Sequence, residues 1–276
     1  MPELPEVETV RLTLLEGGLR GLAIRGVRVV HPGAVHWPDP MRFAQEIAGR
    51  RIEGLGRRGK FLLVDLGART LVCHLRMTGR LWLSAAEEPP LSHTHVVFEL
   101  SDGRELRFRD VRRFGGFHLL ERDGSMAPAL LDRLGPEPTD LSAQAFASGC
   151  ARHRRSPVKS LLLDQEFVAG LGNIYADEAL HRAGVHPVRT CGSLSKQEQR
   201  AIRLAMRAVL RDALRHRGTT FLDFRDGTGE PGAFQEFLQV YRREGLPCRR
   251  CGTPIAKRRI AGRGTHFCPR CQPEGE

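Results

Sequence analysis

Four cysteines near the C-terminal end of the sequence restrict the possible folds more than any other feature. Cys248, Cys251, Cys268 and Cys271 form two Cys-x2-Cys pairs separated by sixteen residues. This spacing is typical of a tetrahedral site for one structural zinc ion, built from two tight turns. Ala261-Gly262-Arg263-Gly264 between the pairs predicts the turn of a β-hairpin. A disulfide framework is the alternative, but no export signal accompanies the cysteines, and we favour zinc.

The charge of the chain indicates its partner. Lys and Arg total 43 against 32 Asp and Glu, a net charge of +11, and the pI is about 10.0. An excess of this size favours a nucleic acid, with acidic proteins and membrane surfaces as weaker alternatives. No apolar run reaches the roughly 18 residues that span a bilayer. With no signal-peptide pattern either, we expect a soluble, cytoplasmic protein that does not bind membranes.

The first half of the chain has the pattern of β-strands. Short runs rich in Val, Leu and Phe recur at roughly ten-residue spacing, which is typical of an antiparallel sandwich. The runs are 23–30, 61–66, 71–75, 95–100 and 105–109, and Asp102-Gly103 between the last two predicts a hairpin turn. A helix is expected from Pro5 to Glu16 on the flank of the sandwich, with Val7, Val10 and Leu14 facing the core.

The second half has helical patterns. A Gly- and Pro-rich stretch that includes Asp123-Gly124, Pro128 and residues 135–138 predicts a linker or hinge. Two helices, 158–165 and 174–183, flank a glycine-rich double turn, an arrangement suited to binding phosphate. Ser195 and Glu198 predict the capping box of a longer helix. Residues 219–234 are either a mobile functional loop or disordered.

These patterns predict an α+β fold in three parts. The parts are an N-terminal antiparallel β-sandwich with its helix at 1–134, a helical domain with a helix-two-turn-helix at 135–240, and a zinc-ribbon β-hairpin held by the four cysteines at 241–276. A chain of 276 residues is long enough for one large domain or two ordinary domains with cores of their own.

The N-terminus combines an amine with a carboxylate. Removal of Met1 before a small residue would leave Pro2 as a secondary amine, partly unprotonated because its pKa lies near the usual α-amino range of about 7.7–8.0. Such an amine attacks an aldehyde-like carbon and forms an iminium directly. Glu3 is adjacent, and Glu6 follows one helical turn later. Taken alone, the segment is more typical of a capped amphipathic helix.

Basic and apolar residues alternate in three loops of the first half. Lys60 follows a basic cluster, while Met77, Arg112 and Phe114 are flanked by Gly and Arg. Met and Phe usually belong to a core, but on such loops they can enter a base stack as wedges.

Five motifs together make the whole chain resemble the bacterial formamidopyrimidine-DNA glycosylases, which excise 8-oxoguanine. They are Met1-Pro2-Glu3-Leu4-Pro5-Glu6-Val7-Glu8-Thr9, His74-Leu75-Arg76-Met77-Thr78-Gly79, Asp110-Val111-Arg112-Arg113-Phe114-Gly115, Asp164-Gln165 with Gly170-Leu171-Gly172-Asn173-Ile174-Tyr175-Ala176-Asp177-Glu178, and Gly262-Arg263-Gly264-Thr265 before Cys268. Each motif alone is weak, but their shared order is specific.

The resemblance implies a role for each matching residue. Pro2 is the expected Schiff-base nucleophile at the sugar C1′, Glu3 the general acid/base, Lys60 a second essential amine, and Arg263 a phosphate contact tied to the second elimination. Glu6 supports catalysis. The expected DNA contacts are His74, Met77, His93, Arg112, Phe114, Arg155, Lys159 and Asn173, with Met77, Arg112 and Phe114 filling the space of a flipped nucleotide. The loop 219–234 matches the family's lid. A monomer acting on double-stranded DNA is expected.

Two alternatives stay open. An endonuclease VIII-like enzyme removes oxidised pyrimidines with the same machinery, although Leu4 and the intact Met77-Arg112-Phe114 set favour the purine enzyme. A non-catalytic zinc-ribbon DNA-binding protein explains the charge and the four cysteines, but neither the Pro2-Glu3 start nor Lys60.

Overall fold

The structure, a computed structural model, describes residues 2–121, 130–260 and 262–274. The chain forms two compact units: unit 1 is Met1–Leu130 with Leu214–Gln235, and unit 2 is Leu131–Ala213 with Glu236–Glu276. The part of the predicted linker that holds Asp123-Gly124 and Pro128 lies outside the described residues. The predicted three-part division places 219–234 in the helical domain, whereas the compact units group this segment with the N-terminal residues.

Unit 1 contains two β-sheets, as the α+β prediction requires. The first sheet has the order β1 (Ile24–Val29), β7 (Thr94–Leu100), β8 (Arg104–Asp110), β6 (Gly79–Ala85), and the second has the order β2 (Val35–Trp37), β9 (Gly116–Glu121), β5 (Arg69–His74), β4 (Phe61–Asp65), β3 (Gly54–Arg58). Every predicted run is a strand, and β7 and β8 form the predicted hairpin. Pairing is antiparallel except between β2 and β9, which are parallel.

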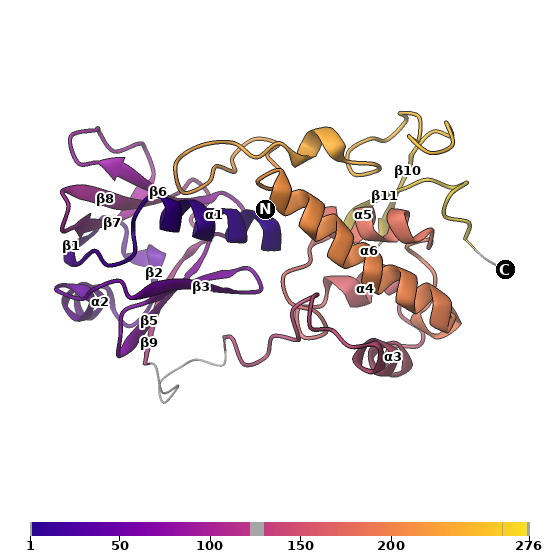
Figure 1. The fold of residues 1–276 in the computed structure, drawn as a ribbon, viewed down its shortest axis with the longest axis horizontal. Coiled ribbons are helices and arrows are strands. Elements are labelled where there is room, and N and C mark those ends of the chain that lie inside the picture. The colour runs from indigo at the N-terminus through magenta and orange to yellow at the C-terminus, as the bar shows by residue number, and fades with distance from the viewer. Residues whose placement is uncertain (1, 122–129, 261, 275–276) are drawn as a thin grey trace. The chain divides into compact units, whose positions relative to one another are not determined.

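Helix α1 (Leu4–Glu16) supplies part of the core of unit 1. Val7, Val10 and Leu14 are fully buried and belong to the same cluster as Phe98 and Phe117 of the sheets. The helix contacts β3 and β4 of one sheet and β6 of the other, and it is labelled between β3 and β6 in Figure 1. Its apolar face therefore joins the two sheets, and the core holds its N-terminal turn.

Two helices were not predicted from the sequence. They are α2 (Pro40–Ile47) in unit 1 and α3 (Ala143–Arg152) in unit 2, and each begins after a side-chain cap. Asp39 accepts hydrogen bonds from the N–H groups of Met41 and Arg42, and Ser142 accepts one from Ala145. The capping residues were the signal for both helices, but the helices are short, with eight and ten residues, so each has few apolar positions from which a helical period can be recognised.

Residues 219–234 follow a defined path on unit 1. Phe224 is only 7% exposed and joins the core. The N–H of Leu83 donates to the carbonyl of Gly227 (3.0 Å), and the N–H of Gly227 donates to Thr13 Oγ1 on α1 (2.8 Å). This segment is held by the same helix that carries the N-terminal residues.

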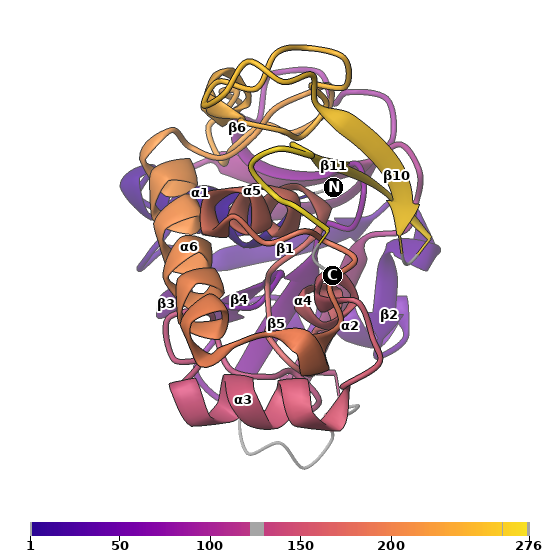
Figure 2. The same cartoon turned by 90° about the vertical axis from the view of Figure 1, so that its right-hand side faces the viewer.

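Unit 2 contains α4 (Val158–Leu163), α5 (Asn173–Ala183), most of α6 (Lys196–Arg215), and a hairpin of β10 (Ala256–Ile260) and β11 (Arg263–Phe267). The two strands of this hairpin lie side by side in Figure 2. Ser195 and Glu198 form the predicted capping box: the N–H of Ser195 donates to Glu198 Oε2 (2.7 Å), and the N–H of Glu198 donates to Ser195 Oγ (3.2 Å).

Three short 3-10 helices complete the described part of the chain. They are η1 (Pro32–Ala34) in unit 1, η2 (Cys191–Ser193) in unit 2, and η3 (Phe234–Phe237) at the boundary between the two residue ranges. Within the described ranges, no helix combines the length and apolar character needed to cross a membrane.

Candidate active site and nucleic-acid interface

The N-terminal residues are buried at the start of α1. Pro2 is buried, and Glu3 is 2% exposed at the N-cap of the helix. The N–H of Glu3 donates to Glu6 Oε2 (2.8 Å) within a capping box. Pro5 fits the first turn because its missing N–H would have no helical partner there. Capping thus fixes the position of the residue that follows the expected nucleophile.

Glu6 also binds the segment that resembles a lid. Its side chain is 1% exposed, and Oε1 accepts the N–H of Thr219 (2.7 Å) while Oε2 accepts that of Glu3. One buried carboxylate therefore joins the N-terminus to residues 219–234.

Gly218 is the residue before this contact, and its environment requires a glycine. Its backbone is left-handed, with a φ of 76°, a conformation that strongly favours glycine. A Cβ added there would lie 2.8 Å from Glu6 Oε1. A side chain at this position would therefore push the carboxylate away from the N–H of Thr219.

Lys60 lies in the turn between β3 and β4 and is 7% exposed. Arg57 connects this turn to α1, because its Nε donates to Glu8 Oε2 (3.0 Å) and its Nη1 donates to the carbonyl of Gly59 (2.8 Å).

Glu8 is held in its charged form by two arginines. Burial raises the pKa of Glu8, but the hydrogen bonds and charges of Arg11 and Arg57 outweigh this effect and lower the pKa. The structure thus places Pro2, Glu3 and Lys60 in one unit, on elements that contact each other.

Asp110 connects the two loops that carry the expected wedge residues, a role that its sequence context did not indicate. Its side chain is fully buried at the end of β8. Oδ2 accepts the N–H groups of Phe114 (2.8 Å) and Gly115 (2.7 Å), while Oδ1 accepts the N–H of Arg112 (3.2 Å) and the hydroxyl of Thr78. One carboxylate therefore fixes the shape of the Arg112–Phe114 loop and joins it to the Met77–Thr78 loop.

The side chains on these loops are accessible. Phe114 is 52% exposed, with the Arg112 guanidinium 4.8 Å from the centre of its ring, and Met77 is half-buried. A Phe that belongs to a core is normally buried. The exposure of Phe114, on a loop whose backbone is fixed, therefore indicates that this ring is not part of the core. This arrangement suits insertion into a stack of bases.

His93 is exposed, and its backbone has a left-handed φ of 66°. Its carbonyl accepts the N–H of Asp110 (3.1 Å). The residue expected to contact DNA is thus held by the backbone of the residue that organises the wedge loops.

His74 is buried beside the Met77 loop. Its Nδ1 accepts the N–H of Arg76 (2.8 Å). Burial lowers the pKa of His74 to about 3, and the charges of Arg76 and Lys60 contribute. In its neutral form, the ring therefore carries its proton on Nε2.

A second histidine makes unit 1 sensitive to acid. Burial, followed by the charges of His36 and Arg76, lowers the pKa of His118 to about 4. An unfolded histidine titrates near 6.5, so between about pH 6.5 and 4 the unfolded chain binds more protons. The stability that this neutral histidine contributes is therefore complete above pH 6.5 and is lost as the pH falls.

We predict that His118→Gln makes the free energy of unfolding of unit 1 less dependent on pH between about 6.5 and 4, because this titrating group is removed. Both tryptophans, Trp37 and Trp82, belong to unit 1, so their fluorescence during urea denaturation reports on it. Exposed His153→Gln in unit 2 is the control. An unchanged pH dependence in His118→Gln would contradict the assignment.

In unit 2, Lys159 is an internal anchor. It is fully buried, and its Nζ lies 2.6 Å from Asp177 Oδ1 and 2.6 Å from Thr265 Oγ1. Asn173 Nδ2 donates to the carbonyl of Gly264 (2.9 Å). The residues just after Arg263 are therefore fastened to α4 and α5.

The two remaining basic residues of the predicted interface differ from Lys159. Arg155, before α4, and Arg263, at the start of β11, are both exposed. Their guanidinium groups can therefore meet a phosphate, whereas the ammonium group of Lys159 is enclosed.

The four cysteines form the zinc-binding site. Their Sγ atoms all lie within 4.8 Å of one another. The Cys248–Cys271 and Cys251–Cys268 sulfur distances are 3.9 and 3.5 Å. Tetrahedral Zn–S bonds of about 2.3 Å require sulfurs about 3.8 Å apart, so the residues fit the ion. The other cysteines, Cys73, Cys150 and Cys191, are buried elsewhere.

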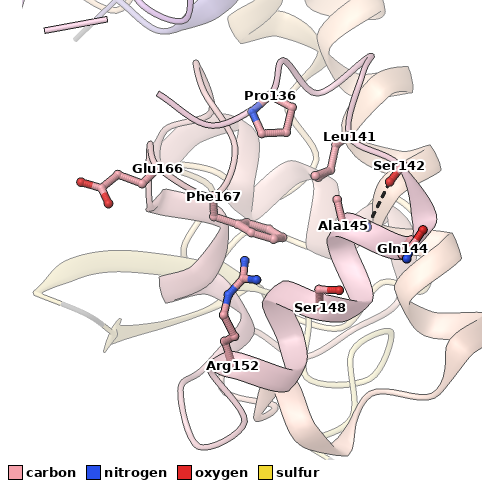
Figure 3. A pocket seen from close by; sticks show the side chains of 9 residues that line it. All are labelled: Pro136, Leu141, Ser142, Gln144, Ala145, Ser148, Arg152, Glu166 and Phe167. Atoms are coloured by element: carbon pink, nitrogen blue, oxygen red, sulfur yellow. Dashed lines mark hydrogen bonds between the residues drawn. The ribbon is translucent and has the colours of Figure 1, made fainter. Parts of the chain in front are cut away.

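A pocket in unit 2 contains none of the predicted site residues (Figure 3). Its volume is ≈ 430 Å³, and the ring of Phe167 and the side chain of Arg152 border it. The lining residues are Pro136, Leu141, Ser142, Gln144, Ala145, Ser148, Arg152, Glu166 and Phe167.

Three family models match successive parts of the chain. Residues 1–117 match the formamidopyrimidine-DNA glycosylase N-terminal domain, and residues 134–224 match the formamidopyrimidine-DNA glycosylase H2TH domain. Residues 245–273 match a zinc finger found in FPG and IleRS.

Similar proteins extend over the whole chain. A formamidopyrimidine-DNA glycosylase of Pelotomaculum thermopropionicum is 49% identical over 274 residues, covering 99% of each chain. A Lactococcus lactis FPG mutant in complex with Fapy-dG-containing DNA has a TM-score of 0.91 at 36% identity, covering 99% of this chain and 100% of that one. The Lactococcus lactis Fpg bound to DNA with an abasic site has a TM-score of 0.90 at 36% identity, covering 98% and 99%.

Proposed function

The chain belongs to the formamidopyrimidine-DNA glycosylase family, and we infer from this membership that it is a bifunctional DNA repair enzyme. It excises oxidised purines, 8-oxoguanine and formamidopyrimidines, from duplex DNA, and then cleaves the abasic strand as a lyase. The observation that carries this conclusion is the match along the full chain, together with a buried Pro2-Glu3 start at a capped helix.

The proposed chemistry begins at Pro2. Once Met1 is removed, the secondary amine of Pro2 forms a bond from its nitrogen to C1′ of the damaged nucleotide as the bond from C1′ to the base breaks. The proton that this nitrogen loses passes to the leaving base. Glu3 donates a proton to the ring oxygen, the sugar opens, and a cationic iminium remains. This cation accepts electrons during the β- and δ-eliminations, which release the 3′ and then the 5′ phosphate.

The surrounding residues of unit 1 support these steps. Glu6 positions Glu3 through its backbone N–H, and Lys60 supplies a second amine from a turn fixed to α1 by Arg57.

The two wedge loops, which carry Met77 and Arg112–Phe114, insert into the gap that the extruded nucleotide leaves in the duplex. Met77, Arg112 and Phe114 occupy the space of the extruded nucleotide, which offsets an unstacking cost of about a few kcal/mol. His74 and His93 contact the DNA near these loops.

In unit 2, we assign the phosphate contacts to Arg155, Asn173 and Arg263. The buried Lys159 acts by holding the Thr265 segment in place next to Arg263. Zinc supplies a structural crosslink between the two cysteine pairs, which orders the hairpin carrying Arg263.

Borohydride trapping tests the proposed function. The protein should become covalently bound to duplexes that contain 8-oxoguanine, because borohydride reduces the iminium to a stable amine. Preferential trapping on thymine glycol would instead indicate an endonuclease VIII-like enzyme, and an absence of trapping on either lesion would indicate a non-catalytic DNA-binding protein. Mass spectrometry of the trapped peptide should locate the adduct on Pro2; an adduct on Lys60 would move the nucleophile there.

Replacement of Arg263 tests the phosphate contact. Affinity should fall with salt at a log–log slope of about −0.9 per neutralised phosphate. Arg263→Ala should reduce the magnitude of this slope by roughly one unit. Arg25→Ala, which removes the same charge from β1, is the control. An unchanged slope in Arg263→Ala would show that this side chain does not contact the backbone of DNA.

We propose that the enzyme acts as a monomer on chromosomal DNA in the bacterial cytoplasm, and that residues 1–134, 135–240 and 241–276 are its catalytic, helical and zinc-finger domains. Analytical ultracentrifugation tests the oligomeric state, and limited proteolysis near residues 134 and 240 tests the domain boundaries.

A further inference from the structure

A fully buried histidine lies against the zinc site. His181 on α5 is 0% exposed, and its Nε2 lies 3.6 Å from Cys248 Sγ. Its Nδ1 is also buried and has no hydrogen-bond partner within the described ranges. Both residues belong to unit 2. A neutral imidazole carries one N–H, and the nitrogen facing an acceptor is the one that holds it.

His181 is outside the ligand set. The cluster of mutually close donor atoms consists of the four cysteine sulfurs, which already supply the four ligands of a tetrahedral site. A cysteine bound to zinc is a thiolate, which accepts hydrogen bonds but has no proton to donate. The contact between His181 and Cys248 is therefore a hydrogen bond from Nε2–H to the sulfur of a zinc ligand.

We propose that His181 is a positioning residue of the zinc site, which lowers the charge on the Cys248 sulfur and ties the metal to α5. Cys248 also accepts the backbone N–H of Arg250 (3.4 Å), so two donors share this sulfur. Thiolates around a single Zn²⁺ carry more negative charge than the ion neutralises. Donors that withdraw charge from a sulfur make it a weaker base and favour the metal over a proton.

The same helix holds the rest of the C-terminal module. The buried carboxylate of Glu178 accepts the N–H groups of Gln239 (2.9 Å), Val240 (2.9 Å) and Tyr241 (2.9 Å), just before the first cysteine pair. With His181 at the first metal ligand, α5 contacts two successive parts of the module. The inference depends on the zinc site and not on the glycosylase activity, so failure of one leaves the other intact.

Two substitutions separate the hydrogen bond from packing. His181→Phe keeps a ring but loses the donor, while His181→Gln keeps an N–H at similar reach. The exposed His153→Phe is the control. Zinc affinity, measured by competition with a chromophoric chelator, should fall about 10- to 100-fold in His181→Phe. It should fall less in His181→Gln and stay unchanged in the control.

The absorption of the Co²⁺-substituted full-length protein gives a second readout. Loss of the donor raises the energy of the sulfur lone pairs, so the sulfur-to-cobalt charge-transfer band of His181→Phe should move to longer wavelength. His181→Gln should retain the parent position. If His181→Phe does not fold, His181→Asn, which is too short to reach the sulfur, replaces it. The proposal is overturned if His181→Phe keeps the zinc affinity and the band position of the parent. It is also overturned if His181→Gln changes both quantities as much as His181→Phe does, because His181 would then act only by packing.

Discussion

Glu3→Gln is expected to lose excision of 8-oxoguanine from duplex DNA by several orders of magnitude, yet still cleave DNA that already contains an abasic site. Removal of an intact base requires C1′ to become electrophilic while the sugar ring opens. That step needs a proton donor at the ring oxygen. Gln keeps the shape and a hydrogen-bonding group, but it can neither donate nor accept the catalytic proton.

The abasic substrate is less demanding because part of it is already the open aldehyde. The Pro2 amine can attack this carbon without a proton delivered to the ring. Glu3 is 2% exposed, and its backbone is fixed by Glu6, so the substitution should leave the position of α1 unchanged. The variant should therefore remain trapped by borohydride on abasic DNA.

Single-turnover rates on the two substrates measure the difference. Glu16→Gln, at the exposed end of the same helix, is the matched control and should act as the parent on both. Equal loss of both activities would mean that Glu3 serves Pro2 itself. Comparable retention of both would remove Glu3 from the mechanism.

Asp110→Asn is expected to reduce excision from duplex DNA on the order of 100-fold or more, because the wedge loops lose their shape. Asn retains one acceptor oxygen and replaces the other with an amide NH₂ group. If the NH₂ group takes the place of Oδ2, the N–H groups of Phe114 and Gly115 lose their acceptor. If it takes the place of Oδ1, the N–H of Arg112 loses its acceptor. Each buried N–H left without an acceptor costs about 1–3 kcal/mol. The loop would relax to satisfy them, and Phe114 and Arg112 would leave their positions.

This defect should depend on the duplex. A single-stranded abasic substrate needs no wedge, because there is no stack to open. We therefore expect Asp110→Asn to cleave it at a rate close to that of the parent. Asp102→Asn, in the turn between β7 and β8, is the control. Equal losses on duplex and single-stranded substrates would place Asp110 in the active site, and full activity on the duplex would show that the loops keep their shape without it.

The sequence was sufficient for features encoded by short spacings. The zinc ligands come in Cys-x2-Cys pairs, the Asp102-Gly103 turn joins neighbouring strands, and Val7, Val10 and Leu14 share one helical face. Within each cysteine pair, the turn and the helical face, the residues are only a few positions apart, so chain geometry brings them together. The two cysteine pairs meet at one site through the hairpin of β10 and β11. Strand β3 consists of two glycines, one leucine and two arginines, so its sequence has no alternation of apolar and polar residues. It forms because it pairs with β4.

The partners of the buried polar side chains became visible only in the folded chain. Glu6 binds the N–H of Thr219, which is 213 positions away, and His181 lies 67 positions from Cys248. Lys159, expected from the family resemblance to contact DNA, is paired with Asp177 inside unit 2, and nothing in its local sequence indicated this partner. A buried polar group must find a hydrogen-bond partner, but nothing in its local sequence specifies which one. That choice depends on which distant segments pack together, and packing is a property of the whole fold.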